Sequence, residues 1–181
     1  MQVLVVYESR YGATQGIAEQ IAATLRHQGL EATLQPAEHA GEPAGYDAAV
    51  IGSATYQSHW MKHATEFVRR NRTVLATRPV WLFSSGPLGP EDRDAGGRDL
   101  RLVMEPKEIA EFKETIKPRD HRVFFGALDR NTLGFTDRLV LKLPANRGDA
   151  LPEGDFRDWG EVAAWAISIA RVLKTSADSS I

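Results

Sequence analysis

Three short stretches of this sequence hold hydroxyl, aromatic and glycine residues of kinds that bind ligands. The first, "SRYGAT", has hydroxyl groups at Ser9 and Thr14 and a residue without a side chain at Gly12. It precedes a stretch with helical spacing, and the first N–H groups of a helix attract anions with the help of the helix dipole. A turn that only caps the helix uses the same residue types, so this stretch alone leaves both interpretations open.

The glycine content of this first stretch limits the kind of anion. It has one Gly and no Lys, so it is neither the G-x-G-x-x-G motif of dinucleotide sites nor the Walker loop of triphosphate sites. A single phosphate group, bound by neutral donors, is the ligand that fits best.

The second and third stretches would contact a flat ring. "ATYQSHW" brings Tyr56, His59 and Trp60 into one loop, and aromatic side chains stack well on planar groups. Trp60 could instead pack beneath the helix that follows, and both interpretations stay open. "SSGPLG", which begins at Ser84, offers small polar side chains and backbone groups to the edge of a ligand.

Each of these stretches follows a short apolar run that predicts a buried β-strand. Runs with helical spacing separate the strands, and Gly29 and Asp158 stand where helix caps belong. This alternation predicts an α/β fold with a doubly wound five-stranded parallel sheet, in which ligands bind at the carboxyl ends of the strands. The predicted strands are 3–6, 30–34, 46–53, 80–85 and 121–128; the predicted helices span 17–25, 60–68, 109–116 and 159–173.

The composition narrows the class of protein. The chain has 181 residues, a net charge of −2 and no Cys, so disulfides, thiolate catalysis and iron–sulfur clusters are excluded and nucleic acid is not an indicated partner. We find no signal peptide, no apolar run of about 20 residues and no metal-binding motif. We therefore expect a cytoplasmic protein with one domain over residues 1–174 and a disordered tail over 175–181.

Together, one phosphate loop and two ring-contacting loops predict flavin mononucleotide (FMN) as the ligand. A phosphorylation receiver domain shares this fold, but it requires an Asp at the end of the third strand. Here that strand ends in Gly52 and Ser53, which disfavours a receiver.

Two longer stretches carry a family resemblance. "VVYESRYGATQGIAEQIA" resembles the flavodoxin fingerprint, in which hydroxyl residues and one Gly bind the FMN phosphate. "HRVFFGALDRNTLGFTDRLVLKL" and "DFRDWGEVAAWAISIA" are similar to the menaquinone-dependent protoporphyrinogen oxidases, a flavodoxin-like branch with an extra segment after strand five. The resemblance covers nearly the whole chain.

This resemblance implies an FMN-dependent oxidoreductase that passes electrons to a quinone, with no assigned catalytic acid or base. Many flavodoxins have a Gly near the flavin ring that favours one-electron transfer, and "ATYQSHW" has none, so we expect two-electron transfer. The implied cofactor-binding residues are Ser9, Arg10, Tyr11, Gly12, Ala13 and Thr14 for the phosphate, and Thr55, Tyr56, Gln57, Ser85 and Gly86 for the ring.

Two other functions stay open: an electron carrier for a protein partner, and a binding module without redox turnover. The segment after strand five alternates Leu139, Leu141 and Leu143 with other residues. It would either pack over the sheet edge or contact a quinone or a membrane surface, although its charges are balanced. Homo-oligomerisation is compatible with the sequence, which does not specify it.

Overall fold

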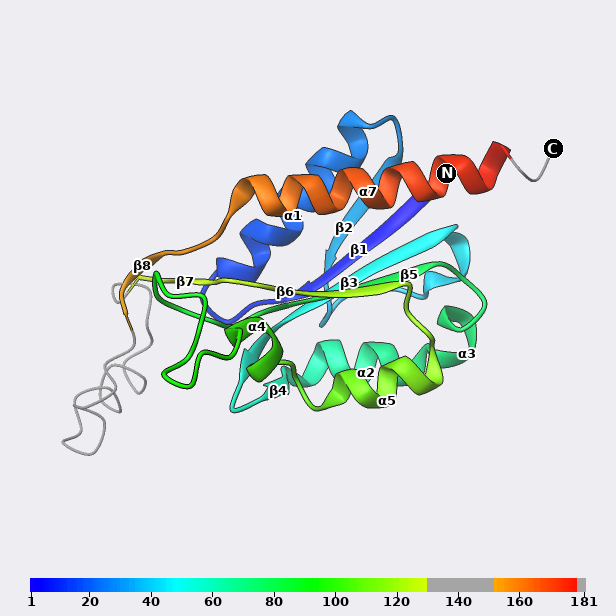
Figure 1. The fold of residues 1–181 in the computed structure, drawn as a ribbon. Coiled ribbons are helices and arrows are strands. Elements are labelled where there is room, and N and C mark those ends of the chain that lie inside the picture. Colours follow the sequence, from blue (N-terminus) through cyan, green and yellow to red (C-terminus); the bar gives the residue numbers. More distant parts are fainter. Residues whose placement is uncertain (130–151, 179–181) are drawn as a thin grey trace.

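A parallel sheet forms the centre of the computed structural model, which describes residues 1–129 and 152–178 (Figure 1). The strands lie in the order β2-β1-β3-β5-β6, the doubly wound order with a switch point between β1 and β3. The predicted α/β fold with five parallel strands is thereby confirmed. Its strands are β1 (Gln2–Glu8), β2 (Glu31–Pro36), β3 (Ala48–Tyr56), β5 (Val80–Ser85) and β6 (Asp120–Phe124).

Helices cover both faces of this sheet, which explains why its central strands are continuously apolar. Val3–Val6 of β1 are fully buried, and every residue of β5 is buried. One face packs against α1 (Ala13–His27) and α7 (Trp159–Asp178) (Figure 1). The other face packs against α2 (Lys62–Arg70) and α5 (Glu108–Thr115), with α3 (Arg72–Leu75) following α2.

The helix caps follow the predicted positions. Gly29 has a φ of 81° after α1, and its N–H donates to the Arg26 carbonyl at 2.9 Å. At α7, the Asp158 carboxylate accepts from the Glu161 N–H at 2.9 Å. Helix α7 continues to Asp178, four residues into the stretch expected to be a disordered tail.

The fifth predicted strand, 121–128, is wrong as one continuous element. Strand β6 leaves the sheet after Phe124, because the Gly126 N–H donates to the Pro87 carbonyl at 2.8 Å and turns the chain. A second short strand, β7 (Ala127–Leu128), then pairs antiparallel with β8 (Gly154–Asp155). These two strands form a separate small sheet beside the main one.

The second helix begins later than the sequence predicted. Trp60 belongs to a two-residue strand, β4 (His59–Trp60), that pairs antiparallel with the end of β3. The chain reverses at Gln57 and Ser58, so the indole points into the core before α2 begins at Lys62.

The long loop after β5 contains one more helix, α4 (Leu100–Val103), and a short 3-10 turn over Pro43–Gly45 precedes β3. None of the helices in residues 1–129 and 152–178 has the length and apolar character that a bilayer span demands. The alternating stretch at Leu139, Leu141 and Leu143 lies outside the described residues.

Candidate functional site

The turn between β1 and α1 leaves an open helix N-terminus at the edge of the sheet. Gly12 has a φ of 85°, and beyond its two chain neighbours no described atom lies within 4 Å of where a Cβ would stand. The Ser9 hydroxyl accepts from the Gly12 N–H at 3.0 Å, and the first helical bond runs from Gly16 to the Gly12 carbonyl. The N–H groups of residues 13–15 therefore have no acceptor within the helix, which suits an anion.

The Arg10 side chain connects this turn with the end of β3. Its guanidinium carbon lies 5.4 Å from the centre of the Tyr11 ring and 5.5 Å from that of the Tyr56 ring. Both distances suit a cation–π interaction. Burial raises the pKa of Tyr56, and the nearby Arg10 charge partly opposes this rise.

The end of β3 and β4 form a tight β-hairpin, residues 55–60, called here the aromatic hairpin. Gln57 and Ser58 have φ angles of 51° and 62°, and positive φ at both central residues is what a type I′ turn requires. Thr55 pairs with Trp60 and Tyr56 with His59. Tyr56 is 39% exposed, so it is accessible to a planar ligand.

Trp60 packs in the core and is not available for stacking. It is 4% exposed, and its ring meets the Phe112 ring edge-on at 5.3 Å. Its indole N–H donates to the Ser84 hydroxyl at 2.7 Å. Of the two open interpretations of Trp60, packing is therefore the correct one, although the packing is against α5.

The end of β3 adjoins the loop after β5. A Cβ at Gly86 would lie 3.2 Å from the Thr55 Cβ, so a side chain there would push the two segments apart by a few tenths of an ångström. Ser85, directly before Gly86, is 4% exposed. The structure thus brings Thr55, Tyr56 and Gly86 together at the edge of the sheet, while Gln57 lies at the exposed tip of the aromatic hairpin.

Two buried hydroxyl groups at this edge have no hydrogen-bond partner within the described residues: Tyr11 Oη and Thr55 Oγ1. Leaving a buried hydroxyl without a partner costs about 1 to 3 kcal/mol. A ligand, a water molecule or an ion bound at this edge would supply the missing partner. One of them belongs to the predicted phosphate loop and the other to a predicted ring-contacting loop.

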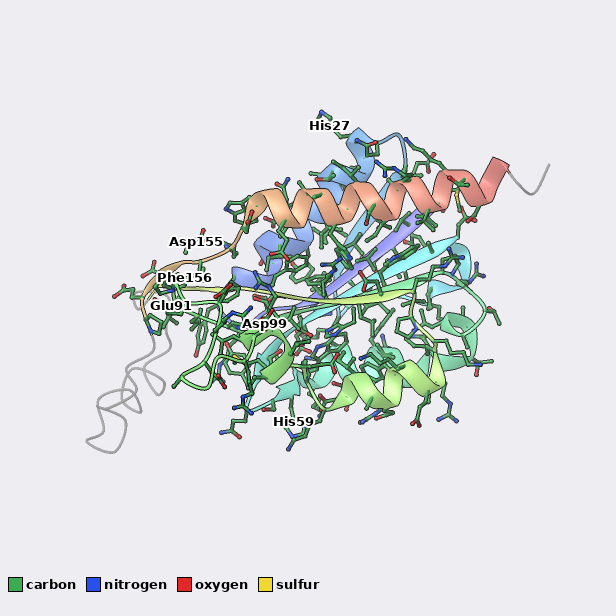
Figure 2. The ribbon with its side chains drawn as sticks, in the orientation of Figure 1. His27, His59, Glu91, Asp99, Asp155 and Phe156 are labelled. Atoms are coloured by element: carbon green, nitrogen blue, oxygen red, sulfur yellow. The ribbon has the colours of Figure 1, made fainter. Side chains whose placement is uncertain are left out.

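Two glutamates that the sequence did not single out brace the aromatic hairpin and α2. Glu108 accepts from the Trp60 N–H at 3.0 Å and pairs with His59 Nδ1 at 2.7 Å. Glu8, at the end of β1, accepts from the Ala64 N–H at 2.7 Å and caps α2. Figure 2 shows His59 on the outer surface, on the side of the sheet covered by α2 and α5.

The ionisation of Glu108 suits this bracing. Burial opposes its charge, but the hydrogen bonds from His59 and from the Trp60 N–H outweigh burial and hold the pKa of Glu108 below its ordinary value. No sequence motif indicates these partners, because 48 or more residues separate each glutamate from the group it binds.

The sequence profile that describes the flavodoxin domain matches residues 4–151. The chain belongs to the flavodoxin domain family. A curated relative, protoporphyrinogen IX dehydrogenase (quinone) of Escherichia coli strain K12, is 26% identical over 95% of this chain and 96% of its own. The predicted resemblance to flavodoxins and to that branch of oxidases is therefore confirmed.

Solved flavodoxin structures share the fold at low sequence identity. A flavodoxin from the domain Archaea is 17% identical with a TM-score of 0.58, covering 96% of this chain and 99% of the other. A mutant flavodoxin from Pseudomonas aeruginosa gives 16%, 0.57 and the same coverage. The rubredoxin oxygen:oxidoreductase of Desulfovibrio gigas has a TM-score of 0.58 at 15% identity, and the match covers 36% of that protein.

Flavodoxin domain proteins bind FMN, and the edge of this sheet fits that cofactor. The open turn at Gly12 leaves room for a phosphate beside N–H groups that have no acceptor within the helix, and the unsatisfied hydroxyls of Tyr11 and Thr55 can offer further hydrogen bonds. The chain is a flavodoxin-like flavoprotein. Within the described residues, no three His, Cys, Asp or Glu side chains gather as a metal site.

Proposed function

We propose that this protein is an FMN-dependent oxidoreductase that passes two electrons at a time from a small reduced substrate to a quinone-type acceptor. The observation that carries the proposal is the likeness to a quinone-linked dehydrogenase over almost the full length of both chains. The two solved flavodoxins cover the chain equally far, so coverage alone would suit a carrier as well. The sequence identity to the dehydrogenase, 26%, is higher than the 17% and 16% to those flavodoxins, which favours the dehydrogenase.

The proposed binding residues have distinct roles. The open N-terminus of α1 would bind the phosphate, with Ser9, Arg10, Tyr11, Gly12, Ala13 and Thr14 around it. Thr55, Tyr56, Gln57, Ser85 and Gly86 would surround the ring. The flavin, when bound, supplies the electron chemistry, and these residues orient it and exclude water.

The aromatic hairpin supports the preference for two-electron transfer. A Gly in this turn would allow its backbone to reorient at small cost, whereas the Cβ atoms of Gln57 and Ser58 restrict the φ angles that the turn can adopt. The Ser58 carbonyl also accepts from the Lys107 N–H at 3.0 Å, which restrains the turn further. A backbone held in this way has little freedom to follow a change in the flavin's charge.

Anaerobic stopped-flow measurements test the proposal. The FMN-loaded protein is reduced photochemically and mixed either with a soluble menaquinone analogue or with cytochrome c, a one-electron protein acceptor. We expect fast reoxidation by the quinone, one quinol formed per flavin, and slow reaction with the cytochrome. Fast reaction with the cytochrome and none with the quinone would identify an electron carrier instead.

A second measurement addresses the donor. A porphyrinogen is supplied to the oxidised protein together with the menaquinone analogue, and porphyrin fluorescence is followed. Fluorescence that grows faster than in a protein-free control is expected if the donor is a reduced tetrapyrrole.

Contact with a membrane surface, homo-oligomerisation and a cytoplasmic location stay predictions.

A further inference from the structure

A chain of hydrogen bonds runs behind the aromatic hairpin, from the buried Trp60 to the exposed side chains of Glu105 and Lys113. The Trp60 indole N–H donates to Ser84 Oγ at 2.7 Å, and Ser84 Oγ lies 2.8 Å from His121 Nε2. On the other side of the ring, His121 Nδ1 lies 3.1 Å from Glu105 Oε1, which also accepts from Lys113 Nζ at 2.9 Å. The chain links β4, β5, β6 and α5.

Only one protonation state of His121 satisfies every member of this chain. Trp60 can only donate, and an ionised Glu105 can only accept. Neutral His121 therefore donates from Nδ1 to Glu105 and accepts the Ser84 hydroxyl proton at Nε2. If His121 gains a proton, Nε2 becomes a second donor to Ser84 Oγ, and the hydroxyl proton of Ser84 loses its acceptor.

This Ser–His–Glu arrangement has the connectivity of a hydrolytic triad but not the access of one. Ser84 is fully buried, and its oxygen already accepts from Trp60. A nucleophile needs an open path to its substrate. Instead, Ser84 holds the indole of Trp60 through the hydrogen bond from its N–H.

Trp60 in turn determines where the proposed ring-contacting residues lie. It pairs directly with Thr55 across the aromatic hairpin, and its indole packs against Phe112. A shift of the indole therefore moves the strand that carries Thr55 and Tyr56. Because Gln57 and Ser58 hold unfavourable φ angles, the turn depends on such contacts to keep its shape.

The surroundings of His121, taken together, favour its neutral form, and burial is the main cause. Burial lowers the pKa of His121, and the Lys113 charge lowers it further. Glu105, by its hydrogen bond and its charge, and Asp120, by its charge, oppose this shift without cancelling it. The imidazole side chain is 4% exposed, so a proton gained there must be accommodated by the surrounding hydrogen bonds.

We propose that His121 is a positioning residue of the flavin site, which in its neutral form holds the aromatic hairpin through Ser84 and Trp60 and releases it on protonation. Binding of the flavin ring then weakens as the solution becomes acidic. This inference rests on the proposed ring-contacting role of Thr55 and Tyr56.

The flavin-free protein provides the first test. The indole N–H resonance of Trp60 is followed by ¹H–¹⁵N NMR from pH 8 to pH 5. We expect its shift to titrate together with the His121 ring in the wild type and to stay constant in His121→Gln. In Ser84→Ala the ring should still titrate while the indole does not respond. An indole shift that titrates equally in wild type and His121→Gln would overturn the proposal.

Flavin affinity provides the second test. Riboflavin is the probe, because the phosphate of FMN titrates near pH 6 and would mask the effect. Fluorescence quenching should show roughly fivefold weaker riboflavin binding at pH 5.5 than at pH 8 in the wild type, an ordinary size for coupled equilibria. We expect no such change in His121→Gln, while His39→Gln, at an exposed histidine, should behave as wild type.

The outcomes separate this inference from the proposed function. Riboflavin affinity that does not depend on pH in the wild type, or depends on it equally in His121→Gln, would refute the role of His121. Failure of the reduced protein to react with quinones, with the pH dependence intact, would refute only the quinone acceptor.

Discussion

The phosphate turn after β1 and the aromatic hairpin after β3 both need a backbone with positive φ, and they obtain it in opposite ways. The turn uses Gly12, which adopts φ of 85° without strain and leaves open space beside it. The hairpin uses Gln57 and Ser58 at 51° and 62°, which costs about 1 to 2 kcal/mol per residue.

The difference reflects what each loop must present. An anion site presents backbone N–H groups, so it benefits from a residue without a side chain, which leaves those N–H groups accessible. A ring site presents side chains in fixed positions, so contacts from outside the turn hold its backbone. The Trp60 N–H donates to Glu108, and the Met61 N–H donates to Ser53 Oγ at 2.9 Å. The lesson is that strain is tolerated where surrounding contacts restrain the chain.

Removing the buried contact of the aromatic hairpin should have the largest effect. Trp60→Ala leaves a cavity beside Phe112 and removes the bond to Ser84, so we expect a loss of about 3 to 5 kcal/mol in the free energy of unfolding. Urea denaturation followed by circular dichroism measures it. His59→Ala, on the same short strand but exposed, is the control and should cost less than about 1 kcal/mol. Similar losses in both would mean that the hairpin is not held by its indole.

Giving the phosphate turn a side chain should have the next largest effect. Gly12→Ala strains a positive φ and should cost about 1 to 2 kcal/mol of stability. Gly29→Ala is a matched control, because Gly29 has φ of 81°, also has open space around it, and lies at the far end of α1. We expect both variants to lose stability but only Gly12→Ala to bind FMN more weakly, as measured by flavin fluorescence. Equal affinities would show that the turn does not bind the phosphate.

Relaxing the hairpin should have a smaller and opposite effect. Gln57→Gly removes the strain of φ at 51°, which stabilises the folded protein. It also raises the entropy of the unfolded chain, which opposes folding, so we expect a net stabilisation of about 0.5 kcal/mol. Gln28→Gly, at φ of −81°, relieves nothing and should destabilise. If Gln57→Gly also promotes one-electron reduction in a photoreduction titration, this result supports the proposal that the wild-type turn favours two-electron transfer. A destabilised Gln57→Gly would argue against strain at this residue.

The smallest effect is expected where the two loops meet. Arg10 lowers the pKa of Tyr56 against the effect of burial, so Arg10→Gln should raise that pKa further. NMR detection of the ring carbon that bears the hydroxyl, between pH 8 and 12, measures it. Tyr7, whose pKa burial also raises, serves as the internal reference and should not change. An unchanged Tyr56 pKa in Arg10→Gln would show that the two loops do not interact electrostatically.

The sequence was sufficient to predict the elements whose signals are local. The apolar run at Val3–Val6, the cap at Gly29 and the cap at Asp158 each express a preference of a few adjacent residues, and each lies where it was predicted. The strand order follows from alternating strands and helices, since crossover connections allow few topologies.

The brace around the hairpin could not be predicted in this way. The turn at Gln57 and Ser58 has none of the Gly or Asn residues that signal a type I′ hairpin, so Trp60 was assigned to the helix. His121 and Ser84 are 37 residues apart, and their contact depends on the pairing of β5 with β6. The end of β6 at Phe124 could not be predicted either, because the apolar residues continue beyond it to Leu128.

The small sheet of β7 and β8 has a consequence for the chain segment that leads into α7. Leu128 pairs with Gly154, the Phe156 N–H donates to the Gly126 carbonyl at 3.0 Å, and Arg157 Nη1 donates to the Ala13 carbonyl at 3.2 Å. The approach to α7, where Figure 2 shows Asp155 and Phe156, is therefore bonded both to the chain that follows β6 and to the first turn of α1. A displacement of the first turn of α1 would thus be transmitted through Arg157 to the segment that begins α7.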